Sequence, residues 1–280
     1  MMPEKNLDDI LSSMQSVAMS AGELMRNSSE EERVNVGDYD DMVTIVDLEA
    51  DKLIRETLMK EYPDVITLSE ETCKFDPGYK PDTLYNFSGF LVDPIDGSVN
   101  FSRMITKKYA NFAVSIAYCE KGIPLIGVIY KPLEEEMFHA IRGKGAFLND
   151  NPIHVSDIDS FDQASIELGS FWIRTEIELF QRWFTNEETD VNQILIRGSA
   201  AAALADVARG RIEAMLHSRL NAWDYAAGWV IIEEAGGVVM DGDTSPLTLG
   251  SPFVYGTNKN LHEQIVQIIR DKQGSCETMS

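Results

Sequence analysis

The chain has 280 residues, 44% of them hydrophobic, so it can bury a sizeable core as one large domain or two closely joined halves. Its 24 Lys and Arg residues against 46 Asp and Glu give a formal net charge of -22 at pH 7, which argues against nucleic acid as a partner. Three cysteines at unrelated spacings and an N-terminal stretch without a signal-peptide pattern favour a cytoplasmic location. No apolar run approaches the ~20 residues of a membrane span.

Helices and strands alternate in the predicted first part of the chain. Apolar residues at steps of three and four predict an amphipathic helix over residues 7–27. Residues 42–46 are expected to form a short strand, and Asp47 is expected to open a second helix that ends before Pro63. Further apolar runs are predicted to be strands at residues 65–68, 89–92, 110–118, 124–130 and 136–141. The last three of these are expected to form an antiparallel meander.

The second part of the chain alternates strands and helices more regularly. The predicted strands span residues 164–168, 194–196, 212–216 and 237–240, and the predicted helices 175–184, 199–208, 224–235 and 261–271. Such interleaving is typical of a layered α/β or α+β architecture. We therefore expect an α+β half over residues 1–150 that carries most of the acidic motifs, packed firmly against an α/β half over residues 151–280.

The most informative stretch directly follows an apolar strand and reads Asp93-Pro94-Ile95-Asp96-Gly97-Ser98. Pro94 restricts its own backbone and that of Asp93, so the two carboxylates can converge on one region. Magnesium prefers oxygen ligands, and Asp93, Asp96 and the main-chain carbonyl of Ile95 would offer three of them. Gly97 lets the backbone approach an anion, and Ser98 would cap a helix whose free N–H groups bind phosphate. The alternative is a tight surface turn, because Asp, Pro and Gly all favour turns.

Other acidic positions have ordinary structural explanations when taken singly. Asp224 precedes small residues at 226–228, so it would cap a helix that lies close to a neighbouring element. Glu70 and Glu71 follow a predicted strand, where adjacent acids are most often part of a charged loop. Asp47 lies at the start of its predicted helix, where the positive end of the helix dipole stabilises a carboxylate. Their combination in one chain is what favours a metal site.

The combined motifs resemble those of the inositol monophosphatase family, the lithium-sensitive, magnesium-dependent phosphatases, over most of the chain. Residues 93–101 are similar to the family's first signature, with Ser98 where Thr is usual, and residues 223–237 are similar to its second. Glu70 and Glu71 fit its Gly-Glu-Glu element, with Ser in place of Gly. Residues 43–47 fit its Val-Thr-x-x-Asp element, so the motifs follow one another in the family's order.

The resemblance implies a role for each motif. Two or three Mg²⁺ ions would be held by four carboxylates and one carbonyl: Glu70, Asp93, Ile95, Asp96 and Asp224. Gly97 and Ser98 would bind phosphate, while Asp47, Ser98 and Glu70 would act on the attacking water. A metal ion lowers the pKa of a bound water and stabilises the leaving oxygen. The resemblance also implies a five-layer αβαβα sandwich with the site between its halves, and a homodimer.

The match weakens at positions that bear on the substrate. Members selective for inositol phosphates carry an acid seven positions before Asp224, where this chain has His217, and tend to carry a Lys at the position of Val36. Arg219 either contacts a second phosphate or another anionic group, or is an ordinary surface residue. By resemblance to the family's Gly-Thr-Ala element, three residues would line the substrate pocket: Gly198, Ser199 and Ala200. His217 and Arg219 would lie beside them. The alternatives are that the Ala-rich helix start is ordinary packing and that His217 is an ordinary packed or partly exposed residue.

Two classes of function remain open. The first is hydrolysis of inositol monophosphate or a similar small sugar or polyol phosphate, with fructose-1,6-bisphosphatase and histidinol phosphatase as rivals in the same chemistry. The second is a regulatory binding protein that keeps the fold and has lost turnover. The presence of every expected metal carboxylate favours the enzyme.

Overall fold

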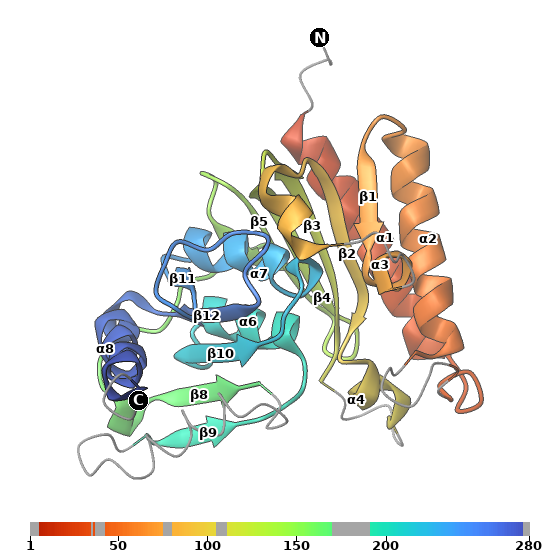
Figure 1. Cartoon of the computed structure of the whole chain (residues 1–280). Helices are drawn as coiled ribbons and strands as arrows, with labels where there is room; N and C mark the ends of the chain where they lie inside the picture. The colour runs from red at the N-terminus through yellow and green to blue at the C-terminus, as the bar shows by residue number, and fades with distance from the viewer. Residues whose placement is uncertain are drawn as a thin grey trace.

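The computed structural model describes residues 6–34, 36, 43–74, 80–104, 111–169 and 191–276. The helices and sheets of these residues form five layers (Figure 1). A pair of N-terminal helices covers a seven-stranded sheet, a central pair of helices separates it from a five-stranded sheet, and the C-terminal helix lies outermost. This arrangement confirms the predicted αβαβα sandwich. Among the residues so described, no helix is long and apolar enough to cross a membrane.

The first layer consists of α1 (Leu7–Asn27) and α2 (Ile45–Glu61). The bounds of α1 are those predicted from its apolar spacing, and its buried face, which includes Met14 and Val17, joins the core beneath the first sheet. Asn6 caps α1, because its side chain accepts a hydrogen bond from the backbone N–H of Asp8 at 3.1 Å.

The strand predicted over residues 42–46 is wrong where the structure describes it. Ile45 and Val46 already belong to α2, whose N-cap is Thr44. Thr44 and Asp47 form a capping box, in which each side chain accepts a hydrogen bond from the other residue's backbone N–H. This reciprocal capping starts the helix before Asp47 and outweighs the β-branched composition of the segment.

The first sheet carries the acidic motif on its second strand. β2 is buried along its whole length, so the alternative of a surface turn at Asp93 to Asp96 is excluded. Its register against β3 shifts between Asp93 and Asp96, an irregularity of the kind that re-aims side chains. β1 runs parallel to β2 and the later pairs are antiparallel, which confirms the predicted meander. In spatial order the strands are β1 (Ile66–Ser69), β2 (Gly89–Asp96), β3 (Ala113–Glu120), β4 (Ile123–Lys131), β5 (Glu136–Ile141), β6 (Ala146–Leu148) and β7 (Asn151–Pro152).

Short helical segments flank β2 and place polar groups at its end. They are α3 (Glu70–Lys74), η1 (Pro81–Asn86) and α4 (Ser98–Ser102). The residue before α4, Gly97, has φ 98°, in the left-handed region that favours glycine. A Cβ atom at this position would lie 2.8 Å from the carbonyl oxygen of Asn111, so both the backbone conformation and the space require glycine.

The central layer consists of α6 (Ala200–Ala208) and α7 (Ala222–Glu234), which lie between the two sheets (Figure 1). Its small residues permit close packing, as the sequence predicts for α7. A Cβ atom at Gly127 of β4 would lie 2.3 Å from the carbonyl oxygen of Ala227, and one at Gly228 would lie 2.5 Å from Leu204. The contact between Gly127 and Ala227 brings the middle of α7 against the first sheet.

The second sheet has the order β11-β12-β10-β8-β9, and α8 (Lys259–Cys276) covers its outer face (Figure 1). Leu261 and Ile265 of α8 join the core cluster of this sheet. The sequence interpretation missed β12, and the helix predicted over residues 175–184 lies outside the described residues. The strands are β8 (Ser165–Leu168), β9 (Gln193–Leu195), β10 (Ala214–Ser218), β11 (Val238–Asp241) and β12 (Phe253–Thr257).

Candidate active site

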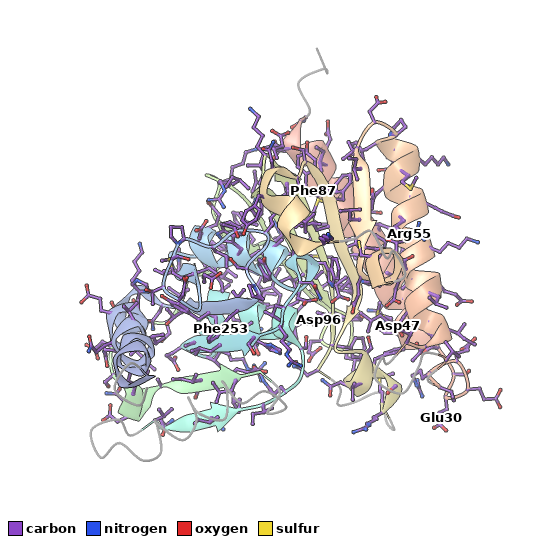
Figure 2. The ribbon with its side chains drawn as sticks, viewed as in Figure 1. Glu30, Asp47, Arg55, Phe87, Asp96 and Phe253 are labelled. Carbon is purple, nitrogen blue, oxygen red and sulfur yellow. The ribbon has the colours of Figure 1, made fainter. Side chains whose placement is uncertain are left out.

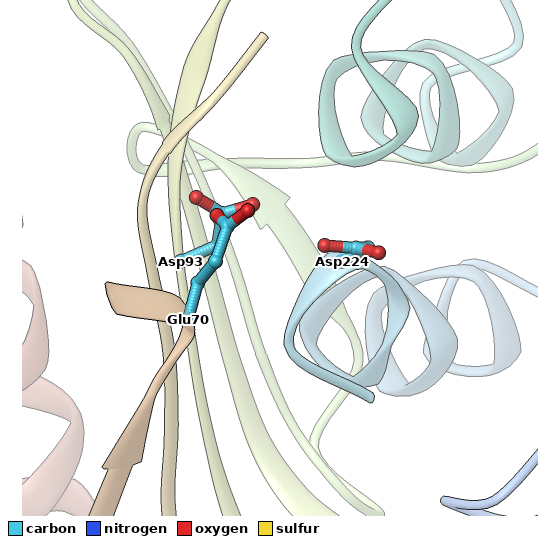
Figure 3. Close-up of side chains that lie close together, drawn as sticks. All are labelled: Glu70, Asp93 and Asp224. Atoms are coloured by element: carbon cyan, nitrogen blue, oxygen red, sulfur yellow. The ribbon is translucent and has the colours of Figure 1, made fainter. Parts of the chain in front are cut away.

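Three carboxylates from distant segments meet where the first sheet faces the start of α7 (Figure 3). Glu70, Asp93 and Asp224 each offer an oxygen atom, and these atoms all lie within 4.8 Å of one another. The pairing of β1 with β2 explains how two of these carboxylates meet. Ser69 pairs with Val92 in parallel register, so the next residues, Glu70 and Asp93, emerge side by side.

The start of α7 brings the third carboxylate. The expectation that Asp224 is the N-cap is wrong, because Asn221 is the N-cap and Asp224 occupies the third helical position. Its Oδ2 accepts a hydrogen bond from the backbone N–H of Asn221 at 2.7 Å, which completes a capping box. The hydroxyl of Ser115 on β3 donates to the carbonyl oxygen of Trp223 at 3.0 Å and ties this first turn to the first sheet.

Asp96 connects the end of β2 to the start of α6. The backbone N–H of Ala201 donates to Asp96 Oδ2 at 2.7 Å, and the hydroxyl of Ser199 donates to the same oxygen. Ser199 is the N-cap of α6, and its hydroxyl also accepts a hydrogen bond from the backbone N–H of Ala202. Asp96 lies near the centre of the molecule (Figure 2).

A second cluster of hydrogen bonds surrounds Asp47. Its Oδ2 accepts hydrogen bonds from the backbone N–H of Thr44 at 2.9 Å and from the Thr44 hydroxyl. The Ser98 hydroxyl lies 2.9 Å from Asp47 Oδ1 and 2.9 Å from the carbonyl oxygen of Ile95, so its single proton serves one acceptor at a time. The expectation that Ser98 caps α4 is wrong, because Gly97 is the N-cap. The Ser98 side chain therefore faces Asp47 instead.

Burial and mutual repulsion make these carboxyl groups unusual acids. Desolvation by burial, followed by the charges of Glu70 and neighbouring aspartates, raises the pKa of Asp93 and of Asp224 well above the ordinary value. Burial also raises the pKa of Asp96 to about 6, against the opposing effect of the hydrogen bonds from Ser199 and Ala201. The pKa of Asp47 is raised too, chiefly by desolvation. A cation placed among these groups would relieve both penalties.

The residues predicted to contact the substrate lie in two places. Gly198 (φ 71°) is exposed, whereas Ser199 and Ala200 are buried at the start of α6. His217 of β10 is half-buried, its Nδ1 lies 2.8 Å from the carbonyl oxygen of Ser218, and its charge acts to lower the pKa of Asp96. Arg219 is exposed and has φ 58°. His217 therefore lies near enough to Asp96 to act on its carboxylate.

Sequence reasoning missed several residues that shape the site. Thr44 holds Asp47 through a capping box, and although the Val-Thr-x-x-Asp element was recognised, its Thr and Asp three residues apart were not interpreted as that cap. Asn100 of α4 donates from Nδ2 to the carbonyl oxygens of Arg197 at 2.6 Å and Asn111 at 2.8 Å. No local pattern predicts these contacts, because they join segments far apart in the chain.

The chain matches the family model described as "Inositol monophosphatase family" over residues 6–273. It is 32% identical over 233 residues to the fructose-1,6-bisphosphatase/inositol-1-monophosphatase of Thermotoga maritima, covering 83% of this chain and 84% of that protein. It is 35% identical over 206 residues to Nus factor SuhB of Escherichia coli, covering 72% of each. The structure of SaIMPase-II with inositol monophosphate bound is 26% identical, has a TM-score of 0.77 and covers 97% of both chains. With its fold, its acidic site and a family match over nearly its whole length, the chain belongs to the inositol monophosphatase family, a family of phosphatases.

Proposed function

We propose that this protein is a Mg²⁺-dependent phosphomonoesterase that hydrolyses inositol monophosphate or a related small sugar or polyol phosphate. The observation that carries the proposal is the convergence of Glu70, Asp93 and Asp224 from three separate segments onto one region. The raised pKa values of Asp93 and Asp224 support the proposal, because a divalent cation would offset the cost of ionising both groups.

The residues fit magnesium by number and kind. Glu70, Asp93 and Asp224 would hold one ion, while Asp96 and the carbonyl of Ile95 would complete the sites for two or three ions in all. Ser199 and Ala201 both donate to Oδ2 of Asp96, and we propose that Oδ1 is the oxygen that binds the metal. When bound, the ions supply positive charge that acidifies water and balances the charge on phosphate.

The protein's own groups would orient the reacting water and the phosphate. When the Ser98 hydroxyl donates a hydrogen bond to Asp47 Oδ1, a lone pair on Ser98 Oγ remains to accept a hydrogen bond from the water. Thr44 holds the Asp47 carboxylate from the opposite side, which fixes the direction of that hydrogen bond. The backbone N–H groups at Gly97 and Ser98 would bind the phosphate, and Glu70 would assist in orienting the water.

Similar proteins support the proposed substrate class. One solved structure of SaIMPase-II contains inositol monophosphate and another contains 2'AMP. The Thermotoga maritima relative is named for both fructose-1,6-bisphosphatase and inositol-1-monophosphatase activity. We propose that the main chain at Gly198, Ser199 and Ala200, with the side chains of His217 and Arg219, contacts the part of the substrate that leaves.

Further expectations rest on the family resemblance. We propose that residues 1–150 and 151–280 act as two halves with the site between them, that two copies form a homodimer, and that the protein works in the cytoplasm. We also propose inhibition by Li⁺ in competition with Mg²⁺. Light scattering would test the dimer, and the Li⁺ dependence of phosphate release at several Mg²⁺ concentrations would test the inhibition.

A second candidate function is regulatory binding without turnover. It is favoured by one relative, the Escherichia coli protein named Nus factor SuhB. A regulatory protein would keep its partner binding in the absence of Mg²⁺ and after loss of a metal carboxylate. The two functions therefore differ in what a single carboxylate substitution does.

The deciding experiment measures phosphate release from a panel of phosphomonoesters with and without Mg²⁺. The panel contains inositol monophosphates, fructose 1,6-bisphosphate, histidinol phosphate and 2'-AMP. We expect release from at least one polyol or sugar phosphate, and a fall of about 100-fold or more in Asp96→Asn. The exposed Asp9 gives a matched control, because Asp9→Asn removes the same charge far from the site and should leave the rate unchanged. Absence of release from every ester would support the regulatory function.

A further inference from the structure

A guanidinium outside the acidic cluster occupies the centre of a buried ionic network. Arg197 follows β9, and its Nε and Nη2 atoms donate to Glu167 Oε2 on β8 at 2.9 and 2.5 Å. Its Nη1 donates to Asp206 Oδ2 on α6 at 2.7 Å. Only 3% of the Glu167 side chain and 0% of the Asp206 side chain are exposed, so Arg197 bridges two buried carboxylates on different elements.

The same network reaches the first sheet through α6. Lys131 Nζ at the end of β4 lies 3.9 Å from Asp206 Oδ1, and the Lys131 side chain is 2% exposed. Arg209 Nε lies 3.4 Å from the same oxygen, and Arg209 Nη1 donates to Glu136 Oε1 of β5 at 2.5 Å. The position of Arg197 is therefore fixed relative to both sheets.

The main chain at Arg197 contacts the elements that form the candidate site. Its carbonyl oxygen accepts the hydrogen bond from Asn100 on α4, whose first residues are the proposed phosphate binders. Two residues later, the Ser199 hydroxyl donates to the Asp96 carboxylate. The intervening Gly198 packs tightly, since its carbonyl oxygen would lie 3.3 Å from a Cβ atom added at Gly97.

We infer that Arg197 is a positioning residue: by clamping Glu167 and Asp206, it fixes the segment that orients the Asp96 carboxylate toward a divalent cation. This inference rests on the proposed function. A guanidinium suits the task because its planar fork binds two carboxylates at once, whereas the ammonium of lysine is a single point charge on a flexible stem. Groups that orient metal ligands typically change metal affinity when they are substituted, even though they never touch the metal.

The test measures Mn²⁺ binding by electron paramagnetic resonance, which needs no turnover. Arg197→Lys keeps the positive charge and loses the fork, so we expect the dissociation constant for at least one Mn²⁺ ion to rise about tenfold. Arg211→Lys is the matched control. Arg211 lies at the exposed end of the same network, 3.8 Å from Asp206 Oδ1, and its substitution should leave Mn²⁺ binding unchanged.

A double-mutant cycle separates positioning from general stability. If Arg197 acts through Ser199, then Arg197→Lys combined with Ser199→Ala should weaken Mn²⁺ binding by less than the product of the single effects. Unchanged Mn²⁺ affinity in Arg197→Lys, with a lower melting temperature, would overturn the inference and leave Arg197 a purely structural residue. Fully multiplicative effects would overturn it as well.

Two further outcomes are covered by the same design. If Arg197→Lys does not fold, Glu167→Gln removes one carboxylate of the clamp and keeps its shape, and it should weaken Mn²⁺ binding in the same direction. Equal Mn²⁺ affinity in that variant would contradict the clamp. Failure of the unsubstituted protein to bind Mn²⁺ would instead refute the metal site on which the proposed function depends.

Discussion

The molecule buries carboxylates in two regions whose charged neighbours differ. Cations surround the carboxylates of one region, and further carboxylates surround those of the other. Around Asp206, the carboxylates are matched by Arg197, Arg209 and Lys131. At the end of β2, Asp93 is surrounded by other acids, and every cause that acts on its pKa raises it. Burying an ionised carboxylate is costly unless it is paired or binds a metal.

The contrast distinguishes a structural acidic cluster from a functional one. In the Asp206 network the protein's own cations offset the buried carboxylates, so it should contribute to stability and respond little to added ions. The Asp93 cluster is incomplete without a cation, so it should cost stability until a divalent ion binds.

The largest effect is expected for Asp93→Asn. Loss of a ligand shared by the metal site should reduce kcat by at least about 1,000-fold, since metal ions supply several kcal/mol of transition-state stabilisation and each 1.36 kcal/mol is tenfold in rate. The metal-free variant should nevertheless be as stable as the parent or more so, because one repelling charge is gone. Phosphate-release assays and urea unfolding with EDTA measure the two quantities. A variant that turns over normally would remove Asp93 from the mechanism.

Asp206→Asn should behave in the opposite way. Removing one partner from a buried ionic network leaves uncompensated charge, so we expect a loss of roughly 3 kcal/mol or more in the free energy of unfolding. Urea denaturation of the metal-free proteins gives this value directly. A variant as stable as the parent would show that the network around Asp206 contributes nothing, and the contrast between the regions would fail.

Proton competition should appear in the acidic cluster. The pKa of Asp96 is about 6 in the folded protein against an ordinary 3.8, so the folded state binds more protons between these values. Its contribution to the stability of the metal-free protein is therefore full below about 3.8 and lost as the pH rises through about 6. Mg²⁺ affinity should change in the other direction and weaken up to about tenfold per pH unit below pH 6, because cation and proton compete.

Melting temperatures and Mg²⁺ activation constants measured between pH 5 and 8 test both signs. Asp96→Asn provides the control, because the amide does not titrate and the part of the pH dependence due to Asp96 should vanish. An activation constant that is independent of pH would contradict the raised pKa.

The smallest effect is expected at the rim of the paired region. Arg211 has a side chain that is 53% exposed and lies 3.8 Å from Asp206 Oδ1. Exposed ion pairs contribute little, so Arg211→Ala should change the free energy of unfolding by less than about 0.5 kcal/mol. A larger loss in urea unfolding would mean that the buried cations do not satisfy Asp206 on their own.

The sequence predicts what is encoded locally and misses what depends on distant partners. The apolar spacing between Leu7 and Asn27 gives both ends of α1, and Asp93 with Asp96 marks the end of a buried strand. The capping box at Thr44 was misread as a strand because two β-branched residues follow it. The β-branched composition of such a short segment therefore has to be interpreted together with the spacing of Thr and Asp that forms the capping box.

Long-range contacts explain the remaining differences. The glycine within β12 weakens its strand signal, and the strand forms because it pairs with both β10 and β11. Arg197 reads as the end of an ordinary apolar run until the fold places Glu167 and Asp206 around it. The convergence of Glu70, Asp93 and Asp224 was expected from resemblance, and their mutual proximity needed the fold.

The most direct measurement is anomalous diffraction from crystals grown with Mn²⁺ and phosphate. We predict an anomalous peak between the carboxylates of Glu70, Asp93 and Asp224, with the phosphate next to it at the start of α4. The account would be contradicted by well-ordered carboxylates with no anomalous density between them at saturating Mn²⁺.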